Sequence, residues 1–234
     1  MDIVLDQSFF HVLYAVVFGL FIKRITEFKN FHADKRCRCW IMLNICSKKI
    51  GETWYSAALD GSKVVATNFA GNEKDALQPM IKSLPYDVPF KTMEKPNGTA
   101  DELFNTMNSI LEGKDVSFNF ELGLSRLPQI TRRVLEVMSL IPTGYVTTYG
   151  SLAKVAGTWP RVAGHACATN PFPPVIPCHR VVASDLSLHG YGGGLKLKWK
   201  ILRKEDRGFK DVSNVKLKGK LLPLFPISHL RPPT

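Results

Sequence analysis

The sequence lacks an apolar run long enough to cross a lipid bilayer. The apolar run at residues 9–22 has 14 residues, whereas a transmembrane helix needs about 20. A secretory signal peptide is also not indicated. Asp2 and Asp6 stand where positive charge is required, and no small-residue cleavage site follows the run. We therefore expect neither a membrane span nor a secreted protein, and no membrane partner.

Residues 1–49 differ in character from the rest of the chain. They could form an added helix, form a monotopic anchor, or precede the true start of translation. We favour the third explanation because Met42 lies just before a segment that begins like a domain.

A disulfide framework is absent. The five cysteines (37, 39, 46, 167 and 178) are an odd number without regular spacing, which indicates reduced thiols in the cytoplasm, or in the nucleus of a eukaryote. Cys37 and Cys39, even with His32 nearby, do not have the usual spacing of a zinc site. We therefore expect no metal.

Nucleotide-binding motifs are missing as well. The three glycines at 192–194 could be taken for a phosphate loop, but the lysine and Ser/Thr of a Walker A motif are absent. No Gly-x-Gly-x-x-Gly spacing leads from a strand into a helix either. We expect the protein to work without a cofactor.

Acidic residues are few relative to basic ones. There are 20 Asp and Glu against 31 Lys and Arg, which gives a net charge of +11 and an isoelectric point near 9.5. Such a surface favours a polyanionic partner, either nucleic acid or an anionic membrane face.

The chain divides into four parts. Residues 1–49 are an extension, and residues 50–125 are an α/β domain. In this domain we expect a hairpin around Asp60-Gly61, helices at 73–84 and 101–111, and a strand at 116–120. Residues 126–208 form a mostly α-helical domain. Residues 209–234 are a tail with four lysines and several prolines, expected to be poorly ordered or to act as a basic arm that binds phosphate.

Two short helices are predicted at 149–156 and 160–169, with Thr148 capping the first. Joined by a tight turn, they could form a helix-turn-helix. The small residues of the second helix would also suit close packing inside the protein, and both interpretations remain open.

The most informative stretch is residues 170–182. Its prolines exclude a helix and stiffen the backbone, and Val181 and Val182 then predict a short buried strand. Between them lies Cys178, followed by His179 and Arg180. A thiol in a stiff, basic setting is expected to ionise and act as a nucleophile. A buried structural cysteine is the alternative.

These motifs resemble the methylated-DNA–protein-cysteine methyltransferases, also called O6-alkylguanine-DNA alkyltransferases. The resemblance extends from about residue 130 to residue 208. It rests on Pro177–Val181, Asn170–Pro171, Thr148–Ala153, Arg161–Ala166, Tyr191–Gly194 and Glu205.

The resemblance implies a fold, an activity and a partner. The first domain would be ribonuclease-H-like, and the second would carry a helix-turn-helix. The protein would be a monomer that binds double-stranded DNA containing O6-alkylguanine and flips the damaged base out. It would transfer the alkyl group irreversibly to its own cysteine, in a single turnover. The alternative is an alkyl-damage sensor or DNA-binding regulator that performs no transfer.

The resemblance also implies residue roles. Cys178 would be the nucleophile, His179 a base acting through a water, and Glu205 the carboxylate that orients His179. Tyr149 would press on the target phosphate and supply a proton, and Arg161 would fill the space that the flipped base leaves. The remaining expected site residues are the DNA-contacting Arg180, Ala163 and Gly164, and the pocket residues Asn170, Pro173, Val181, Tyr191 and Gly192.

Overall fold

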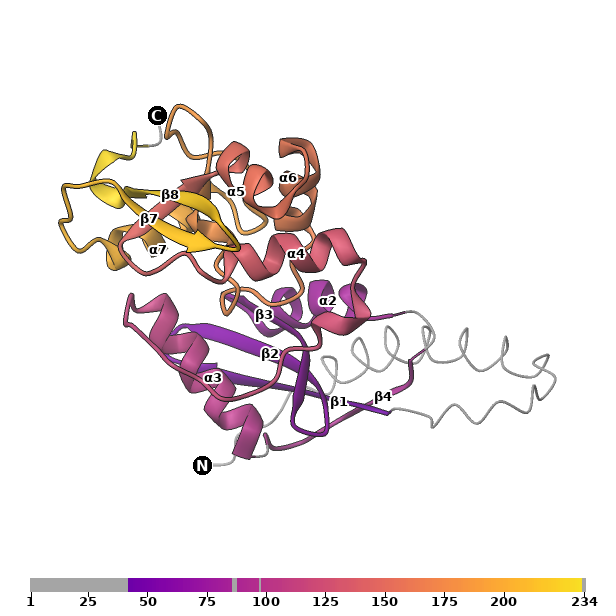
Figure 1. Cartoon of the computed structure of the whole chain (residues 1–234). Helices are drawn as coiled ribbons and strands as arrows, with labels where there is room; N and C mark the ends of the chain where they lie inside the picture. Colours follow the sequence, from indigo (N-terminus) through magenta and orange to yellow (C-terminus); the bar gives the residue numbers. More distant parts are fainter. Residues whose placement is uncertain (1–41, 86–87, 97, 233–234) are drawn as a thin grey trace. The chain divides into compact units, whose positions relative to one another are not determined.

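The structure is a computed structural model that describes residues 42–85, 88–96 and 98–232 (Figure 1). The apolar run at residues 9–22 and the cysteines at 37 and 39 lie outside these ranges. Within the described ranges, no helix is both long enough and apolar enough to cross a membrane.

The first part of the fold is a four-stranded sheet in the order β3-β2-β1-β4. β1, β2 and β3 are consecutive and antiparallel, whereas β4 pairs parallel with β1. The predicted hairpin is confirmed: it turns at Asp60-Gly61, where Gly61 takes a φ of +61°. The strands are β1 (Leu43–Ile50), β2 (Thr53–Asp60), β3 (Lys63–Ala70) and β4 (Phe90–Thr92).

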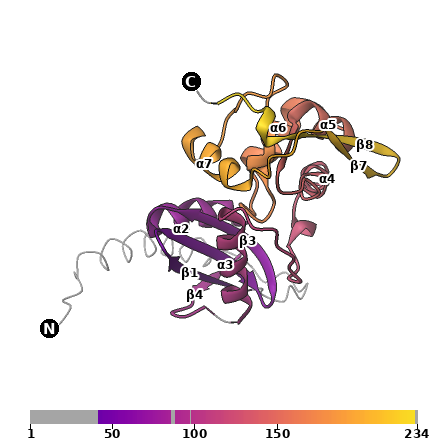
Figure 2. The same ribbon diagram turned by 90° about the vertical axis from the view of Figure 1, so that its left-hand side faces the viewer.

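Two helices cover opposite faces of this sheet (Figure 2). α2 (Glu73–Ser83) packs with Ala58, and α3 (Gly98–Leu111) packs with Ala57 and Leu59. Because successive strand residues point to opposite faces, β2 contributes to the hydrophobic core on both sides. Both helices were predicted.

Two features of this part differ from expectation. The sheet begins at Leu43, before the expected domain boundary at residue 50. Residues 116–120 do not form the predicted strand. Phe118 and Phe120 stack on each other, with ring centroids 4.4 Å apart, and pack against the core. The apolar residues alternate because one face of this extended segment packs against the core. The segment is not a strand because no neighbouring strand within the described ranges bonds to it there.

The second part combines four helices with a second sheet, of order β6-β5-β8-β7. It therefore contains more strand than the mostly α-helical domain that was expected. Its helices are α4 (Gln129–Met138), α5 (Tyr149–Ala156), α6 (Pro160–Ala168) and α7 (Leu195–Glu205). Its strands are β5 (Tyr145–Thr148), β6 (Val181–Val182), β7 (Ser213–Leu217) and β8 (Lys220–Pro226).

The ends of α5 follow the local sequence rules. Thr148 caps its N-terminus by accepting a hydrogen bond from Ser151 N at 3.1 Å, as predicted. Gly157 ends it with a φ of +71°, a left-handed conformation that glycine adopts without strain. α6 follows at once, with Pro160 as its first residue.

The expectation of a poorly ordered tail is wrong. Residues 213–226 form the β7–β8 hairpin, and β8 pairs antiparallel with β5 through Tyr145 and Val146. Leu222 and Leu224 are buried in the core. The apolar residues of the tail alternate along β8, so one face of that strand is buried and the segment is ordered.

Candidate active site

Cys178 lies at the start of a short 3-10 turn, η2 (Cys178–Arg180), which leads into β6. β6 pairs parallel with β5, with Thr147 opposite Val181. The sulfur-bearing residue is therefore held in the turn just before a buried strand. Its side chain is almost fully buried, with 8% of its surface exposed.

The proline segment before Cys178 is fastened to the first sheet by Thr67 of β3. The Thr67 amide donates to the carbonyl of Pro171 at 2.8 Å, and its hydroxyl donates to the carbonyl of Pro173 at 2.7 Å. These prolines have no N–H of their own, so their carbonyls supply the contacts. The first domain thus positions the segment that presents the cysteine.

Asn170 braces the same segment from within. Its Nδ2 donates to the carbonyl of Ile176 at 2.8 Å, and its Oδ1 accepts from the amide of Phe172 at 3.0 Å. The side chain therefore closes the loop that precedes Cys178.

His179, Glu205 and Arg180 form a buried cluster. His179 and Glu205 have no exposed surface, and His179 Nε2 lies 2.9 Å from Glu205 Oε1. Arg180 donates through Nε and Nη2 to the two carboxylate oxygens of Glu205, each at 2.9 Å. Glu205 therefore contacts two residues of the turn that carries Cys178.

This geometry fixes the tautomer of His179. Burial raises the pKa of Glu205, but the contacts with His179 and Arg180 outweigh burial and hold the pKa at about 2. An ionised carboxylate only accepts hydrogen bonds, so Nε2 of His179 must donate. Burial lowers the pKa of His179, so the ring is neutral at pH 7. Its Nδ1, which has no partner in the described part of the chain, carries a lone pair that can accept a proton.

The expectation that Cys178 rests as a thiolate is corrected. Burial raises the pKa of its thiol, and the hydrogen bond from Asn170 and the charge of Lys198 lower it only in part. Desolvation disfavours the charged sulfur more strongly than the basic neighbours favour it. The resting group is a thiol, and a base must remove its proton before it can attack.

Two tyrosines belong to the same surroundings. Tyr149 is the first residue of α5, and its ring lies edge-on to that of His189, with centroids 6.1 Å apart. Burial raises the pKa of Tyr149 to about 12. Burial also raises the pKa of Tyr191. Both hydroxyls therefore stay protonated and able to donate.

The sequence reasoning missed Lys198, a fully buried lysine on α7. Its Nζ donates to the carbonyl of Val181 at 2.6 Å and to that of His189 at 2.9 Å. Burial lowers its pKa to about 8. The signal was present in the sequence, because Lys198 shares the buried stripe of α7 with Ile201, Leu202 and Glu205, at spacings of three, four and seven residues.

The residues expected to contact DNA lie in different environments. Arg161 is exposed near the start of α6, and Gly164 is partly exposed with open space around it. Ala163 is fully buried in the core, so its expected DNA contact is corrected. The expected DNA contact of Arg180 is corrected too. Its guanidinium donates hydrogen bonds to Glu205, to the carbonyl of Ile141 and to the hydroxyl of Thr143 inside the protein.

The residues expected to line the pocket also differ in how exposed they are. Val181 is buried, and Pro173 is partly exposed with its carbonyl bonded to Thr67. Gly192 is exposed, with nothing near the position that a Cβ would take.

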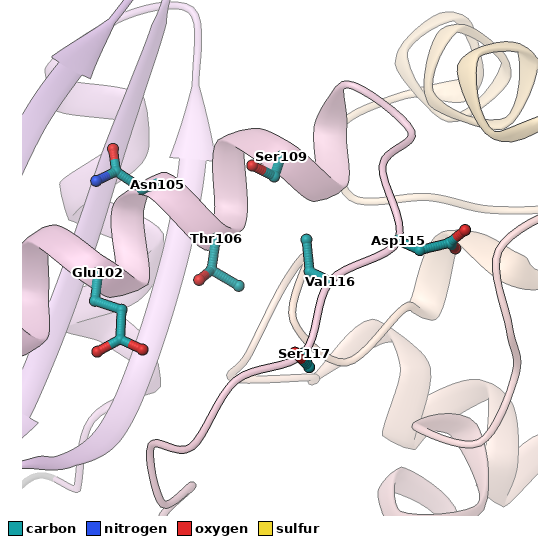
Figure 3. A pocket seen from close by; sticks show the side chains of 7 residues that line it. All are labelled: Glu102, Asn105, Thr106, Ser109, Asp115, Val116 and Ser117. Carbon is teal, nitrogen blue, oxygen red and sulfur yellow. The ribbon is translucent and has the colours of Figure 1, made fainter.

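A cavity of about 650 Å³ lies away from this cluster, between α3 and the segment that follows it (Figure 3). It is lined by polar side chains of α3 together with Asp115, Val116 and Ser117. A second cavity, of about 260 Å³, adjoins Pro177 and Arg180. Cys178 is among the lining residues of neither cavity. Within the described ranges, no cluster of three or more His, Cys, Asp or Glu could hold a metal ion.

Comparison with known proteins identifies the family and the fold. A family profile described as "6-O-methylguanine DNA methyltransferase, DNA binding domain" matches residues 129–207. A crystal structure of the O6-methylguanine-DNA methyltransferase of Pyrococcus kodakaraensis is 28% identical, with a TM-score of 0.56 over 70% of this chain and 99% of that one. The fold is thus that of the alkyltransferases.

Sequence relatives define the family. A methylated-DNA–protein-cysteine methyltransferase of Candida albicans is 34% identical over 55% of this chain and 74% of its own length. The chain therefore belongs to the methylated-DNA–protein-cysteine methyltransferase family. A relative from Methanothermobacter thermautotrophicus is 44% identical over 44% of this chain. That match spans 60% of the relative, less than two thirds of its length.

Proposed function

We propose that this protein repairs double-stranded DNA by transferring an alkyl group from O6 of guanine to Sγ of Cys178, once per molecule. The observation that carries the proposal is the 2.9 Å contact between Nε2 of His179, in the turn that holds the cysteine, and Oε1 of Glu205 at the end of α7. This contact leaves Nδ1 of His179 as a proton acceptor. A protein that only binds DNA would need neither a nucleophile nor a base.

The side chains of the site can account for every proton and electron pair that moves in this reaction. The thiol proton of Cys178 passes through a water to Nδ1 of His179, whose positive charge Glu205 stabilises. The sulfur forms a bond to the alkyl carbon as the bond from that carbon to O6 breaks. The electron pair returns to the guanine, which takes a proton from the hydroxyl of Tyr149. Solvent then carries the proton of His179 back to Tyr149. The thioether is stable, so the protein acts once.

DNA recognition would use α5 and α6 as a helix-turn-helix. An O6-alkyl group is shielded inside the base stack, so the nucleotide must be flipped out at a cost of a few kcal/mol. Exposed Arg161, at the second position of α6, can fill the gap and neutralise phosphate charge. Tyr149 would press on the target phosphate, while Asn170, Pro173, Val181, Tyr191 and Gly192 would surround the flipped base.

The first domain would act as a scaffold of the ribonuclease-H-like type. Its sheet order, β3-β2-β1-β4 with only β4 parallel to its neighbour, supports this assignment. Its contribution to repair would be the contact of Thr67 with the proline segment. We place the repair reaction in the cytoplasm, or in the nucleus of a eukaryote.

The test is the intact mass of the protein after incubation with O6-benzylguanine and, separately, with duplex DNA containing O6-methylguanine. One benzyl or one methyl group should be added per molecule, at Cys178. The Cys178→Ala variant should keep its mass and still bind the duplex. Unchanged mass of the wild-type protein would support a sensor without transfer activity, and labelling at another cysteine would refute the role of Cys178.

A further inference from the structure

The β7–β8 hairpin lies beyond the part of the chain that the family profile matches, which ends at residue 207. Its turn consists of Lys218 and Gly219, with φ of +47° and +79°. Two successive left-handed residues are typical of a type I′ turn, in which asparagine or glycine is favoured at the first position. Lysine is disfavoured there because of its Cβ. The chain nevertheless places a cation at the tip of the hairpin.

The hairpin carries a cluster of unpaired positive charge. Lys216, Lys218 and Lys220 are all exposed. Residues 212–232 contain no aspartate or glutamate. In the described part of the chain, no carboxylate forms an ion pair with any of the three lysines. Such a cluster attracts an anionic polymer.

The hairpin is fastened beside the two proposed DNA-binding helices. Lys220 Nζ donates to the carbonyl of Lys154 at 3.2 Å and to that of Val155 at 3.3 Å. These carbonyls belong to the last turn of α5, the negative end of the helix dipole. Figures 1 and 2 both show the hairpin next to α5. The tip therefore lies close to the turn that joins α5 to α6.

The base of the hairpin is held rigidly. β8 pairs with β5, and the hydroxyl of Thr147 donates to the carbonyl of Pro223 at 2.7 Å. β5 runs directly into Thr148, which caps α5. The position of the lysines is thus set relative to α5, and binding would not require the hairpin to become ordered first.

We propose that the β7–β8 hairpin binds the sugar–phosphate backbone of duplex DNA beside the base pairs that α5 and α6 contact, with Lys216 and Lys218 contacting phosphates. The hairpin would extend the DNA-binding surface beyond the matched domain. This inference rests on the proposed function, since it assumes that the helix pair binds DNA.

The test compares Lys216→Gln/Lys218→Gln with a control that loses the same charge elsewhere, Lys74→Gln/Lys82→Gln on the exposed face of α2. Binding to a duplex is measured over a series of salt concentrations. Two lost phosphate contacts should reduce the slope of log K against log salt by about 2 and weaken binding at moderate salt about tenfold. The control should differ less from wild type. Shortening the duplex on one side of the lesion should abolish the deficit of the hairpin variant.

Two further measurements distinguish a failure of the hairpin inference from a failure of the proposed function. The hairpin variant should react with free O6-benzylguanine at the wild-type rate, because that substrate has no DNA backbone. Lys218→Asn should fold as stably as wild type, since asparagine tolerates the left-handed conformation, and still bind DNA more weakly. Equal salt slopes for the hairpin and control variants would overturn this inference alone. Absence of transfer by the wild-type protein would overturn the proposed function instead.

Discussion

Arg180 donates to both carboxylate oxygens of Glu205, through Nε and Nη2, each at 2.9 Å. The two residues neutralise each other in the interior, so Glu205 can remain ionised beside a neutral His179. A carboxylate buried without Arg180 would take up a proton or would require an imidazolium partner. Arg180 thereby allows His179 to rest in the form that accepts a proton.

Glu205→Gln should remove alkyl transfer and change acid stability. In the wild-type protein the pKa of Glu205 is held at about 2, against an ordinary 4.5. Because the folded pKa is depressed, the stabilisation is complete above pH 4.5 and is lost as pH falls from 4.5 toward 2. The shift corresponds to about 3 kcal/mol. Urea unfolding between pH 2 and pH 6 should give a flatter dependence on pH for the variant; equal slopes would contradict the depressed pKa.

The rate of transfer from free O6-benzylguanine should report the low pKa of His179. Burial lowers this pKa below its ordinary 6.5, so neutral imidazole persists as pH falls through 6.5. We expect a constant rate there and a decline only at lower pH. Stopped-flow measurement of benzyl transfer checks this, and a decline centred above pH 6.5 would mean that His179 rests as an imidazolium.

Lys198→Met should make the Cys178 thiol harder to ionise. The charge of Lys198 lowers the pKa of Cys178, opposing burial. Methionine fills a similar volume without a charge, but it leaves the carbonyls of Val181 and His189 unsatisfied, at a cost of about 1–3 kcal/mol each. The pH dependence of thiol alkylation by iodoacetamide should shift upward relative to wild type, with unfolding followed in parallel. An unshifted profile in a folded variant would show that the charge of Lys198 does not affect the pKa of the Cys178 thiol.

Thr67→Val should slow transfer by loosening the proline segment. The variant removes the hydroxyl that donates to Pro173 at 2.7 Å, a contact worth about 1 kcal/mol. Thr67→Ser keeps the hydroxyl and serves as the matched control. We expect a several-fold slower reaction with O6-benzylguanine for the valine variant and a near-normal rate for the serine variant. A near-normal rate for the valine variant would show that the hydrogen bond from Thr67 to Pro173 does not set the rate of transfer.

Trp159 should report DNA binding by fluorescence. It is 78% exposed and stands directly before α6, where the proposed interface begins. Binding of a duplex should quench its emission, because bases or phosphates would replace water around the indole. Trp159→Phe should bind with much less quenching. An unchanged signal on saturation with DNA, in a protein that binds it, would place the interface elsewhere.

Much of the fold follows from short-range features of the sequence. Asp60-Gly61 forms a hairpin because glycine adopts the left-handed conformation of the turn. Thr148 caps α5 because its side chain reaches an amide three residues away. The prolines before Cys178 exclude a helix wherever the segment lies. These outcomes depend on neighbours in the chain, so sequence alone could predict them.

The chemistry of the site depended on contacts between residues distant in sequence. Glu205 lies 26 residues from His179, and Thr67 lies 106 residues from Pro173. The resemblance to a family suggested the first pair, and nothing suggested the second. The sequence places basic residues beside Cys178, but it does not set how deeply the thiol is buried. Burial decides the sign of the pKa shift, because the interior removes the water that would stabilise a thiolate. Likewise, the sequence supplied Arg180 and the lysines of the tail, and the tertiary structure turned Arg180 inward and left the lysines exposed.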